Sequence, residues 1–318
     1  MAAIRLLLPR LGGVFVKRFF KNKNLEVVLI LLASISAHAK GTVSKHTTTW
    51  KGLTRYYAVY RPQSLAPNPS MVFFLNATSQ NAATNPPYPR MQAWETLADQ
   101  YGFVMVWAMS SYNPLDQSWY WDCYVTDSTF PVLPDDSGFL RWLITSLQSQ
   151  YAVSASKTFV TGMSSGGFMA HRVGADLSDI VAAIAPVSGM IDIHPMGQDF
   201  DPPQPTHPVS VYELQGDVDT VVPYCGGTGW FWGKLHDDLA SSDDSVDFWI
   251  SANACTNRST SAPLCTNGTP TSGVDGLKVT RCSGGAVVVF ERELNVGHAW
   301  VTGTEAKIWA FFRSHPRQ

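Results

Sequence analysis

The sequence predicts an α/β fold in which helices cover both faces of a mostly parallel sheet. Short apolar runs of strand length alternate along the chain with helical patterns, an order typical of parallel sheets with helical crossovers. These runs are apolar at consecutive positions, as expected for strands that are buried on both faces. With 318 residues, of which 45% are hydrophobic, the chain is long enough to bury one large core.

Six apolar runs have the length of buried strands and are rich in Val, Ile, Phe and Ala. They are Met71 to Leu75, Phe103 to Ala108, Thr158 to Thr161, Val181 to Pro186, Val209 to Leu214 and Ala286 to Phe290. No internal repeat is evident among them. We therefore expect a single sheet within one domain.

Five segments between and after these runs have helical patterns. The clearest is Asp136 to Gln150, in which Phe139, Leu140, Leu143 and Leu147 form one apolar stripe. The other four are Met91 to Gln100, Ser165 to Leu177, Asp244 to Ala254 and Thr304 to Ser314.

Residues 1–39 have the features of a signal peptide. Basic residues precede the mostly apolar run Val27 to Ala37, which ends in the small-x-small pattern Ala37-His38-Ala39. This run is shorter than the ~20 apolar residues of a membrane span, which favours cleavage over an uncleaved anchor. A transit peptide is the other alternative, because the region from Met1 to Asn24 is basic and free of acidic residues. We expect an extracellular protein whose single catalytic domain is 40–318, without stable membrane insertion after cleavage.

The charge pattern excludes some partners. The formal net charge is -2 and 15% of the residues are charged, so there is no basic stripe for nucleic acid. No Cys-x-x-Cys pair occurs, which argues against a structural zinc site, and we expect no metal or organic cofactor.

The cysteines and glycosylation sequons fit an oxidising compartment. Five Cys allow two disulfides and leave one Cys over. The sequons that begin at Asn257 and Asn267 lie in a polar stretch, where we expect surface glycosylation. A third sequon begins at Asn76, which closes an apolar strand and is expected to be buried.

A Gly-x-Ser-x-Gly pattern marks the candidate nucleophile, Ser164. The pattern, Gly162 to Gly166, directly follows one predicted strand and opens the next predicted helix. A sharp strand-to-helix turn strains the backbone at the serine, and flanking glycines let strand and helix approach closely. The helix amino terminus favours developing negative charge beside the hydroxyl. A glycine-rich turn without chemistry is the alternative interpretation.

A serine hydroxyl needs a base and an acid that orients the base. Among the histidines after Ser164, His298 stands on a loop between the last predicted strand and the last predicted helix. The turn after the strand Val209 to Leu214 carries two carboxylates, Asp217 and Asp219, and from the residues alone either one could serve.

Taken together, these motifs resemble the secreted polyhydroxybutyrate depolymerases and the related feruloyl and acetylxylan esterases, which are serine esterases of the α/β-hydrolase fold. The resemblance runs from about Arg55 to Phe312. It implies that Asp219 is the acid, with Asp217 in reserve, and that His298 is the base. The matching blocks are Asp135 to Phe139, Thr161 to Gly167, Ala185 to Gly189, Gly216 to Tyr224 and Gly297 to Trp300.

The chain departs from this family at the segment that supplies an oxyanion donor. The family has His-Gly-Cys after the strand, whereas this chain has Asn76-Ala77-Thr78. The resemblance implies an oxyanion hole made by the backbone N–H groups of Thr78 and Ser165. It also implies cleft aromatics at Trp119, Trp121 and Trp300, although core packing is the alternative role for at least two of them.

By the same resemblance we expect Cys255 to pair with Cys282, as in the family. We expect Cys123 to pair with Cys225, which leaves Cys265 over. The implied activity is hydrolysis of a polyester of the poly(3-hydroxybutyrate) type or of feruloyl or acetyl esters of the plant cell wall, the ester being the expected partner. The alternatives are a weak or inactive homologue that binds a glycan or polymer, and a secreted serine peptidase.

Overall fold

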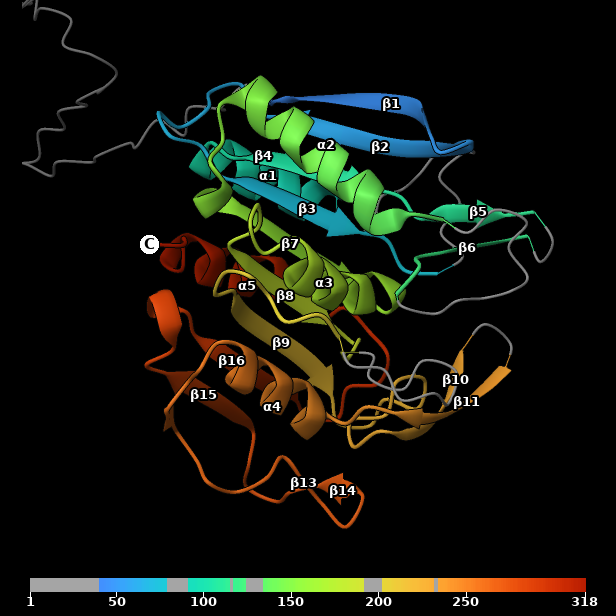
Figure 1. Ribbon diagram of the computed structural model, residues 1–318, viewed down its shortest axis with the longest axis vertical. Coiled ribbons are helices and arrows are strands. Elements are labelled where there is room, and N and C mark those ends of the chain that lie inside the picture. Colours follow the sequence, from blue (N-terminus) through green and yellow to red (C-terminus); the bar gives the residue numbers. More distant parts are fainter. Residues whose placement is uncertain (1–39, 79–90, 115–116, 124–133, 192–201, 232–233) are drawn as a thin grey trace, which may run out of the picture. The chain divides into compact units, whose positions relative to one another are not determined.

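A ten-stranded sheet lies at the centre of the chain in the computed structural model (Figure 1). The structure describes residues 40–78, 91–114, 117–123, 134–191, 202–231 and 234–318. The order of strands is β1-β2-β4-β3-β7-β8-β9-β16-β15-β12. The six central strands are mutually parallel. They are β4 (Val104–Ala108), β3 (Met71–Leu75), β7 (Thr158–Met163), β8 (Ala183–Val187), β9 (Ser210–Gly216) and β16 (Val288–Glu293).

These central strands are the six runs predicted from the sequence, so the expected parallel sheet is confirmed. Strand order reverses between β3 and β7, because β4 follows β3 on one side while β7 and its successors add to the other. Ligands of open α/β sheets bind beyond the carboxyl ends of strands at such a reversal.

Four antiparallel strands that the sequence did not predict flank the parallel ones: β1 (Thr42–Trp50) and β2 (Leu53–Arg61) on one side, β15 (Gly276–Thr280) and β12 (Asn257–Arg258) on the other. β1 is polar and exposed along most of its length, and therefore lacks the continuous apolar pattern of the central strands.

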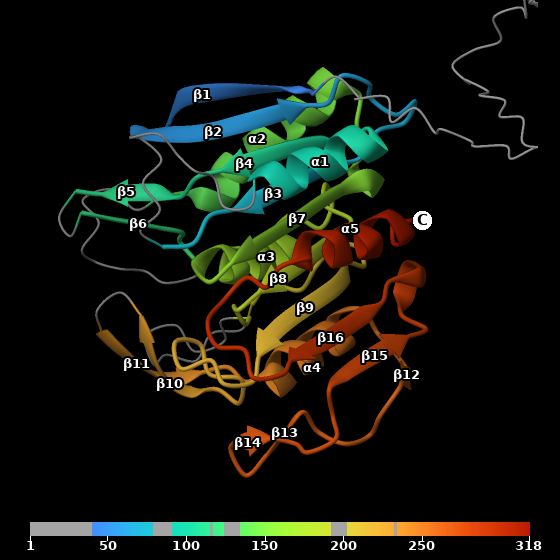
Figure 2. The ribbon, with the colours of Figure 1, turned by 180° about the vertical axis from the view of Figure 1, so that it is seen from behind.

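Three small hairpins complete the strands. They are β5 (Ser111–Asn113) with β6 (Ser118–Tyr120), β10 (Gly227–Phe231) with β11 (Lys234–Leu239), and β13 (Cys265–Thr266) with β14 (Thr269–Pro270). The first two hairpins extend beyond the carboxyl ends of the parallel strands (Figure 2). They flank the end of the sheet where the predicted catalytic residues lie.

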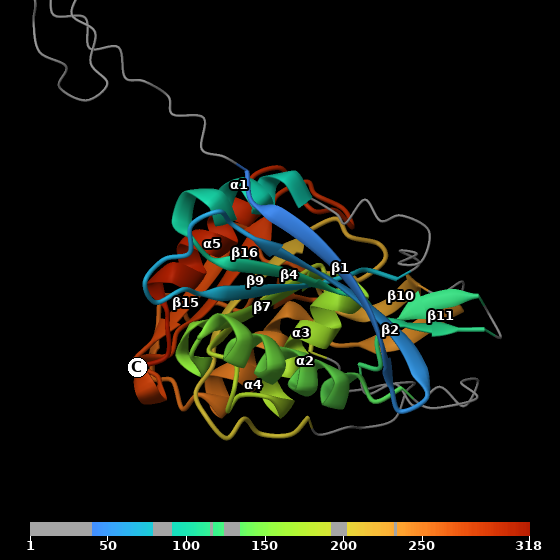
Figure 3. The same cartoon turned by 90° about the horizontal axis from the view of Figure 1, so that it is seen from above.

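Helices cover both faces of the sheet, as predicted. Figure 3 shows α1 (Met91–Tyr101) and α5 (Thr304–Ser314) on one face, and α2 (Asp136–Tyr151), α3 (Ser165–Asp176) and α4 (Ser242–Ala252) on the other. Two short 3₁₀ helices lie at Ala155–Lys157 and Ser283–Gly285. α4 begins before the predicted Asp244, because Ser241 caps it in a reciprocal capping box with Asp244.

The two helical layers create two apolar clusters, and residues of one strand alternate between them. On β3, Phe73 packs in the cluster beneath α2, α3 and α4, while Phe74 packs in the cluster beneath α1 and α5. This alternation follows from the period of two along a strand. Both clusters are buried, so the sheet is fixed from both sides.

A buried ion pair ties β2 to α2. Arg55 and Asp136 are both fully buried, and their Nη1 and Oδ1 atoms lie 2.6 Å apart. The other oxygen of Asp136 accepts a hydrogen bond from the backbone N–H of Asp122 at 2.7 Å. The Arg55 guanidinium also lies 4.0 Å from the ring centre of Phe139. One carboxylate therefore joins an outer strand, a helix start and the segment that contains Asp122.

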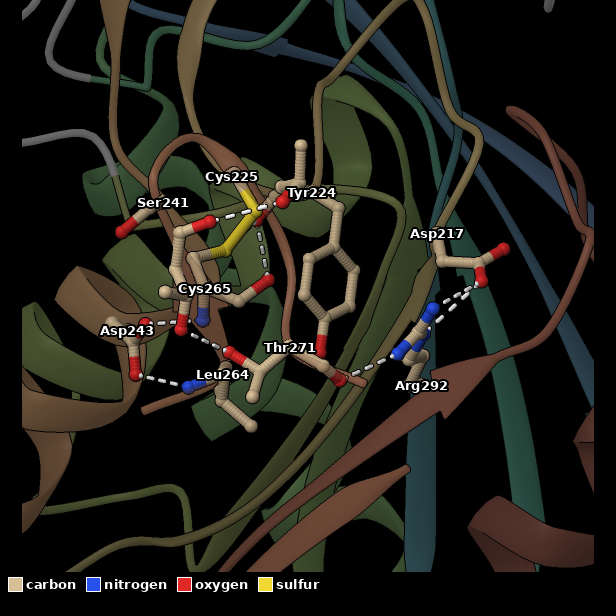
Figure 4. Close-up of a disulfide and its surroundings, with 12 residues drawn as sticks. Asp217, Tyr224, Cys225, Ser241, Asp243, Leu264, Cys265, Thr271 and Arg292 are labelled. Carbon is tan, nitrogen blue, oxygen red and sulfur yellow. Dashed lines mark hydrogen bonds and ion pairs between the residues drawn. A yellow bond between two sulfur atoms is a disulfide. The ribbon is translucent and has the colours of Figure 1, made fainter. Parts of the chain in front are cut away.

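The disulfides confirm one predicted pairing and correct the other. Cys255 is bonded to Cys282, as expected, but Cys225 is bonded to Cys265 rather than to Cys123 (Figure 4). Asp243 brings Cys265 to this place by accepting the backbone N–H groups of Leu264 and Cys265, each at 2.8 Å. Cys123 lies elsewhere, buried with its Sγ 3.4 Å from the carbonyl oxygen of Ser165, and takes part in neither bridge.

Residues 40–318 form one compact unit. The predicted signal peptide, residues 1–39, lies outside the described residues. Within the part of the chain that the structure describes, no helix is long and apolar enough to cross a membrane.

Candidate active site

The predicted catalytic residues gather at the carboxyl ends of the parallel strands. Ser164 directly follows β7, Asp219 lies in the turn after β9, and His298 lies in the loop after β16. The segment with Thr78 follows β3, the neighbour of β7 on the side where strand order reverses. Four segments far apart in the sequence therefore meet at one edge of the sheet.

Ser164 adopts the backbone conformation expected of the strand-to-helix turn. Its φ is 56° and its ψ is -123°, a region that non-glycine residues rarely occupy. Its N–H donates to the carbonyl of Val187 at 3.0 Å, and its carbonyl accepts from the N–H groups of Gly167 and Phe168. These bonds hold the strained residue between β7 and the first turn of α3.

Gly166 permits direct contact between this turn and the end of β3. A Cβ at position 166 would lie 2.2 Å from the carbonyl oxygen of Leu75 and 2.7 Å from that of Asn76. The glycine of the Gly-x-Ser-x-Gly pattern is thus required for the close approach of backbones. It brings the segment from Asn76 to Thr78 beside the start of α3.

Asp219 and His298 form a hydrogen-bonded pair. His298 Nδ1 lies 2.8 Å from Oδ2 of Asp219, whose side chain is fully buried, while that of His298 is 19% exposed. The other carboxylate oxygen, Oδ1, accepts the N–H groups of Val221 and Val222 at 2.8 and 2.9 Å. Because a carboxylate only accepts, Nδ1 of the neutral imidazole carries the proton and Nε2 is left as a base.

Asp217, the reserve candidate for the acid, has a different partner. Its carboxylate accepts from Nε and Nη2 of Arg292 at 3.0 and 2.8 Å, and from the backbone N–H of Asn295 at 2.7 Å (Figure 4). The pair joins the turn after β9 to β16. Of the two carboxylates, Asp219 is the one that bonds to His298.

The loop that carries His298 crosses the strand ends toward Ser164. Gly216 allows the crossing, because a Cβ there would lie 2.2 Å from the carbonyl oxygen of Val296. Two residues after His298, the Trp300 ring lies 5.2 Å from that of Phe74 on β3. The loop therefore contacts both the turn after β9 and β3. In the order of strands, β7, which directly precedes Ser164, lies between β3 and β9.

The two predicted oxyanion donors follow two neighbouring strands, β3 and β7. Ser165 is the first residue of α3, where backbone N–H groups have no partner within the helix. Thr78 lies three residues past the end of β3. The last residue of β3, Leu75, pairs with Gly162 on β7, two residues before Ser164. The segment that contains Thr78 therefore lies beside the start of α3, where Gly166 meets the carbonyl groups of Leu75 and Asn76.

The three tryptophans predicted to contact substrate are largely buried. Trp300 keeps 9% of its surface exposed and Trp119 keeps 6%. Trp121 is fully buried, and its indole N–H donates to the carbonyl of Asn76 at 2.9 Å. Core packing, the alternative weighed from the sequence, describes the position of Trp121.

Three residues that sequence reasoning did not assign support this site. Asn76 is buried, as expected of its sequon, and its side chain bonds to the backbone and hydroxyl of Ser110. Gln215 donates to Asp219 Oδ2 at 3.3 Å and to the carbonyl of Val222 at 2.6 Å. The available signal was that Asn76 and Gln215 both replace a family histidine.

A buried pair of titratable side chains joins α3 to β9. His171 on α3 is 3.7 Å from Glu213 on β9, measured from Nε2 to Oε2. Burial lowers the pKa of His171 to about 3 and raises the pKa of Glu213 well above its ordinary value. Burial therefore favours the neutral form of both groups. His171 Nε2 donates to the carbonyl of Gly189 at 3.1 Å. Gly189 in turn lies against Ser164, because a Cβ at position 189 would lie 2.7 Å from the Ser164 carbonyl oxygen.

No family model matches the chain. It is 26% identical over 175 residues to a bifunctional acetylxylan esterase/xylanase of Neocallimastix patriciarum, covering 55% of this chain and 23% of the relative. It is 31% identical over 135 residues to acetylxylan esterase A of Talaromyces purpureogenus, covering 42% and 33%. It is 26% identical over 155 residues to feruloyl esterase B of Piromyces equi, covering 49% and 27%. The chain thus spans a third or less of the length of each of these relatives.

Solved structures share the fold. The acetyl xylan esterase from Aspergillus awamori superposes with a TM-score of 0.50 at 17% identity, over 85% of this chain and 99% of the other. The feruloyl esterase module from Clostridium thermocellum superposes with a TM-score of 0.51 at 13% identity, over 87% and 88%. The chain is thus a relative in sequence of acetylxylan and feruloyl esterases and has the α/β-hydrolase fold.

Proposed function

We propose that the chain is a secreted serine carboxylic-ester hydrolase in which Ser164, His298 and Asp219 form the catalytic triad. The bond between His298 Nδ1 and the buried Asp219 carboxylate carries this proposal, because it leaves Nε2 of the imidazole as a base. The strained Ser164, at the end of a central strand of the same sheet edge, supports it.

In the proposed first step, His298 Nε2 removes the hydroxyl proton of Ser164 while Oγ bonds to the ester carbonyl carbon. The carbonyl electron pair moves to oxygen, and the N–H groups of Ser165 and Thr78 stabilise the resulting oxyanion. The carbonyl then reforms and the alcohol leaves, taking the proton from His298. Water, deprotonated by His298, attacks the acyl-enzyme in the same way, so the acid departs and Ser164 regains its proton.

Between the ester classes expected from the sequence, we propose acetyl or feruloyl esters of plant cell-wall polysaccharide. The named relatives are acetylxylan and feruloyl esterases, which supports this class over polyesters. Trp119 and Trp300 are our candidates for substrate contact, because each keeps some exposed surface. Flat aromatic side chains suit both a sugar ring and a feruloyl group.

The test compares wild type with Ser164→Ala on p-nitrophenyl acetate, acetylated xylan, methyl ferulate and a poly(3-hydroxybutyrate) film. We expect hydrolysis of the first three by wild type alone, with Ser154→Ala as a control that retains the rate. Equal rates for wild type and Ser164→Ala would exclude Ser164. Labelling by a fluorophosphonate separates the enzyme from a binding homologue, which would not react. A peptidase would cleave a peptide substrate, which we expect this protein to leave intact.

We propose that the mature protein is extracellular and begins at Lys40. The two disulfides fit an oxidising compartment, and the sequon residues Asn257 and Asn267 are exposed. Amino-terminal sequencing of protein collected from the medium should give Lys40 as the first residue. Retention of residues 1–39 on secreted protein would contradict the proposed cleavage.

A further inference from the structure

The segment proposed to supply one oxyanion donor is fixed by side chains from two other parts of the chain. This segment, Asn76 to Thr78, lacks the His-Gly that the resembled family has there. Its Asn76 is 1% exposed and Trp121 and Ser110 are fully buried. These three residues form what we call the Asn76 clamp.

Every polar group of the Asn76 side chain is used in this clamp. Oδ1 accepts the backbone N–H of Ser110 at 2.8 Å, and Nδ2 donates to the Ser110 hydroxyl at 3.0 Å. Nδ2 also donates to the carbonyl of Ala77 at 2.8 Å, which fixes the peptide unit whose nitrogen belongs to Thr78. Because Ala77 O and Thr78 N share one planar peptide, holding the first sets the direction of the second.

Trp121 holds the backbone of the same segment. Its indole N–H donates to the carbonyl of Asn76 at 2.9 Å, the oxygen that Gly166 approaches from the side of the elbow. The Trp121 ring is itself fixed by the Arg55 guanidinium, 5.8 Å from the ring centre. Its neighbour Asp122 is bonded to the buried carboxylate of Asp136.

We infer that Trp121, Asn76 and Ser110 are positioning residues that orient the Thr78 N–H for the oxyanion, in place of the missing His-Gly. This inference rests on the proposed esterase function. Trp121 thereby acts on the transition state through the backbone of Asn76 and Thr78 rather than by touching substrate.

The test is Trp121→Phe, which replaces the buried indole by a smaller aromatic ring and removes the N–H that donates to Asn76. We expect kcat/KM for p-nitrophenyl acetate to fall by tenfold to a hundredfold, that is, less than the roughly 10²- to 10³-fold typical of deleting a donor. Inhibition by an aliphatic trifluoromethyl ketone, which forms an oxyanion with the serine, should weaken by the same factor. The matched control is Trp94→Phe, a fully buried tryptophan in the other apolar cluster.

A merely structural role would lower Tm in both variants without weakening the inhibitor. Equal inhibition constants and equal kcat/KM for Trp121→Phe and Trp94→Phe would overturn the inference. Ser110→Ala deletes one acceptor of the Asn76 amide and should cause a smaller loss of kcat/KM and of inhibitor affinity. If Trp121→Phe does not fold, the same two measurements on Ser110→Ala test the inference. Failure of the proposed function is distinct, because wild type itself would then neither turn over esters nor react with a fluorophosphonate.

Discussion

The indole N–H of Trp249 donates to Nδ1 of His171 across 2.9 Å, deep behind the strand end that carries Ser164. A protonated Nδ1 could not accept this bond, so the geometry agrees with the lowered pKa of His171, about 3. Glu213, with a pKa raised by burial, faces this imidazole from β9. Folding therefore favours the neutral form of each group.

These two shifts predict opposite dependences of stability on pH. For His171 the unfolded chain binds the extra proton, so stability is lost as pH falls from about 6.5 toward 3. For Glu213 the folded chain keeps the proton that the unfolded chain has lost, so stability is lost as pH rises above about 4.5.

We predict that Glu213→Gln removes this alkaline loss. From about pH 4.5 up to the folded pKa of Glu213, wild type should lose up to about 1.4 kcal/mol per pH unit relative to the variant. Urea unfolding of both proteins at pH values from about 5 to about 8 measures the difference. The exposed Asp247→Asn serves as the control with no such trend. A constant difference between wild type and Glu213→Gln across this range would show that Glu213 is ionised in the folded protein.

Asp219→Asn should lower kcat by roughly 10³- to 10⁴-fold under the proposed mechanism. The backbone N–H groups of Val221 and Val222 will hold the amide oxygen at the Oδ1 position, so the amide NH₂ will face His298. The imidazole must then accept at Nδ1, and its proton moves to Nε2, where the base is needed. Asp217→Asn is the control, expected to lower Tm while the kcat loss stays below tenfold. The reverse pattern would assign the acid to Asp217.

Gly166→Ala should destabilise the fold and abolish turnover. The new methyl group would lie 2.2 Å from the carbonyl oxygen of Leu75, and overpacking of this kind typically costs about 1–3 kcal/mol. Gly297→Ala is the matched control for stability, because its Cβ would meet only one atom, at 3.9 Å. Calorimetric Tm values of the two variants test the prediction. Equal Tm values would mean that the start of α3 can move away from the end of β3 without loss of stability.

Replacing both Cys225 and Cys265 by Ser should reduce the free energy of unfolding by up to about 4 kcal/mol, the chain-entropy estimate for a loop of 40 residues. Alkylation of the unreduced, unfolded protein followed by peptide mapping checks the pairing. We expect label on Cys123 alone. Label on Cys265 would instead support the pairing of Cys123 with Cys225.

The sequence predicted the six central strands because each contains a short, mostly apolar run, and β3, β4 and β8 are buried at every position. In β16 only the first half, Val288 to Phe290, carries this signal, and the strand continues to Glu293 with partly exposed polar residues. The sequence could not reveal β1, whose polar run Thr42–Trp50 is exposed and is a strand only through its pairing with β2. The boundary of α4 was missed for a local reason, since Ser241 rather than Asp244 begins it as the cap.

The candidate site was predictable to the level of motifs. Ser164 and His298 stand out by their order along the chain, but Asp217 and Asp219 follow the same strand and differ only in their partners in space. Arg292, which binds Asp217, is 75 residues away in sequence. The same limit applies to the cysteines, because Asp243 places Cys265 beside Cys225 through bonds to backbone N–H groups.

The buried carboxylate of Asp136 has a consequence for how the molecule comes apart on heating. It joins Arg55 on β2 to the segment that holds Trp121, so detaching β2 would release the Asn76 clamp as well. Under the proposed function, loss of ester turnover and melting of β1 and β2 should therefore be one cooperative event.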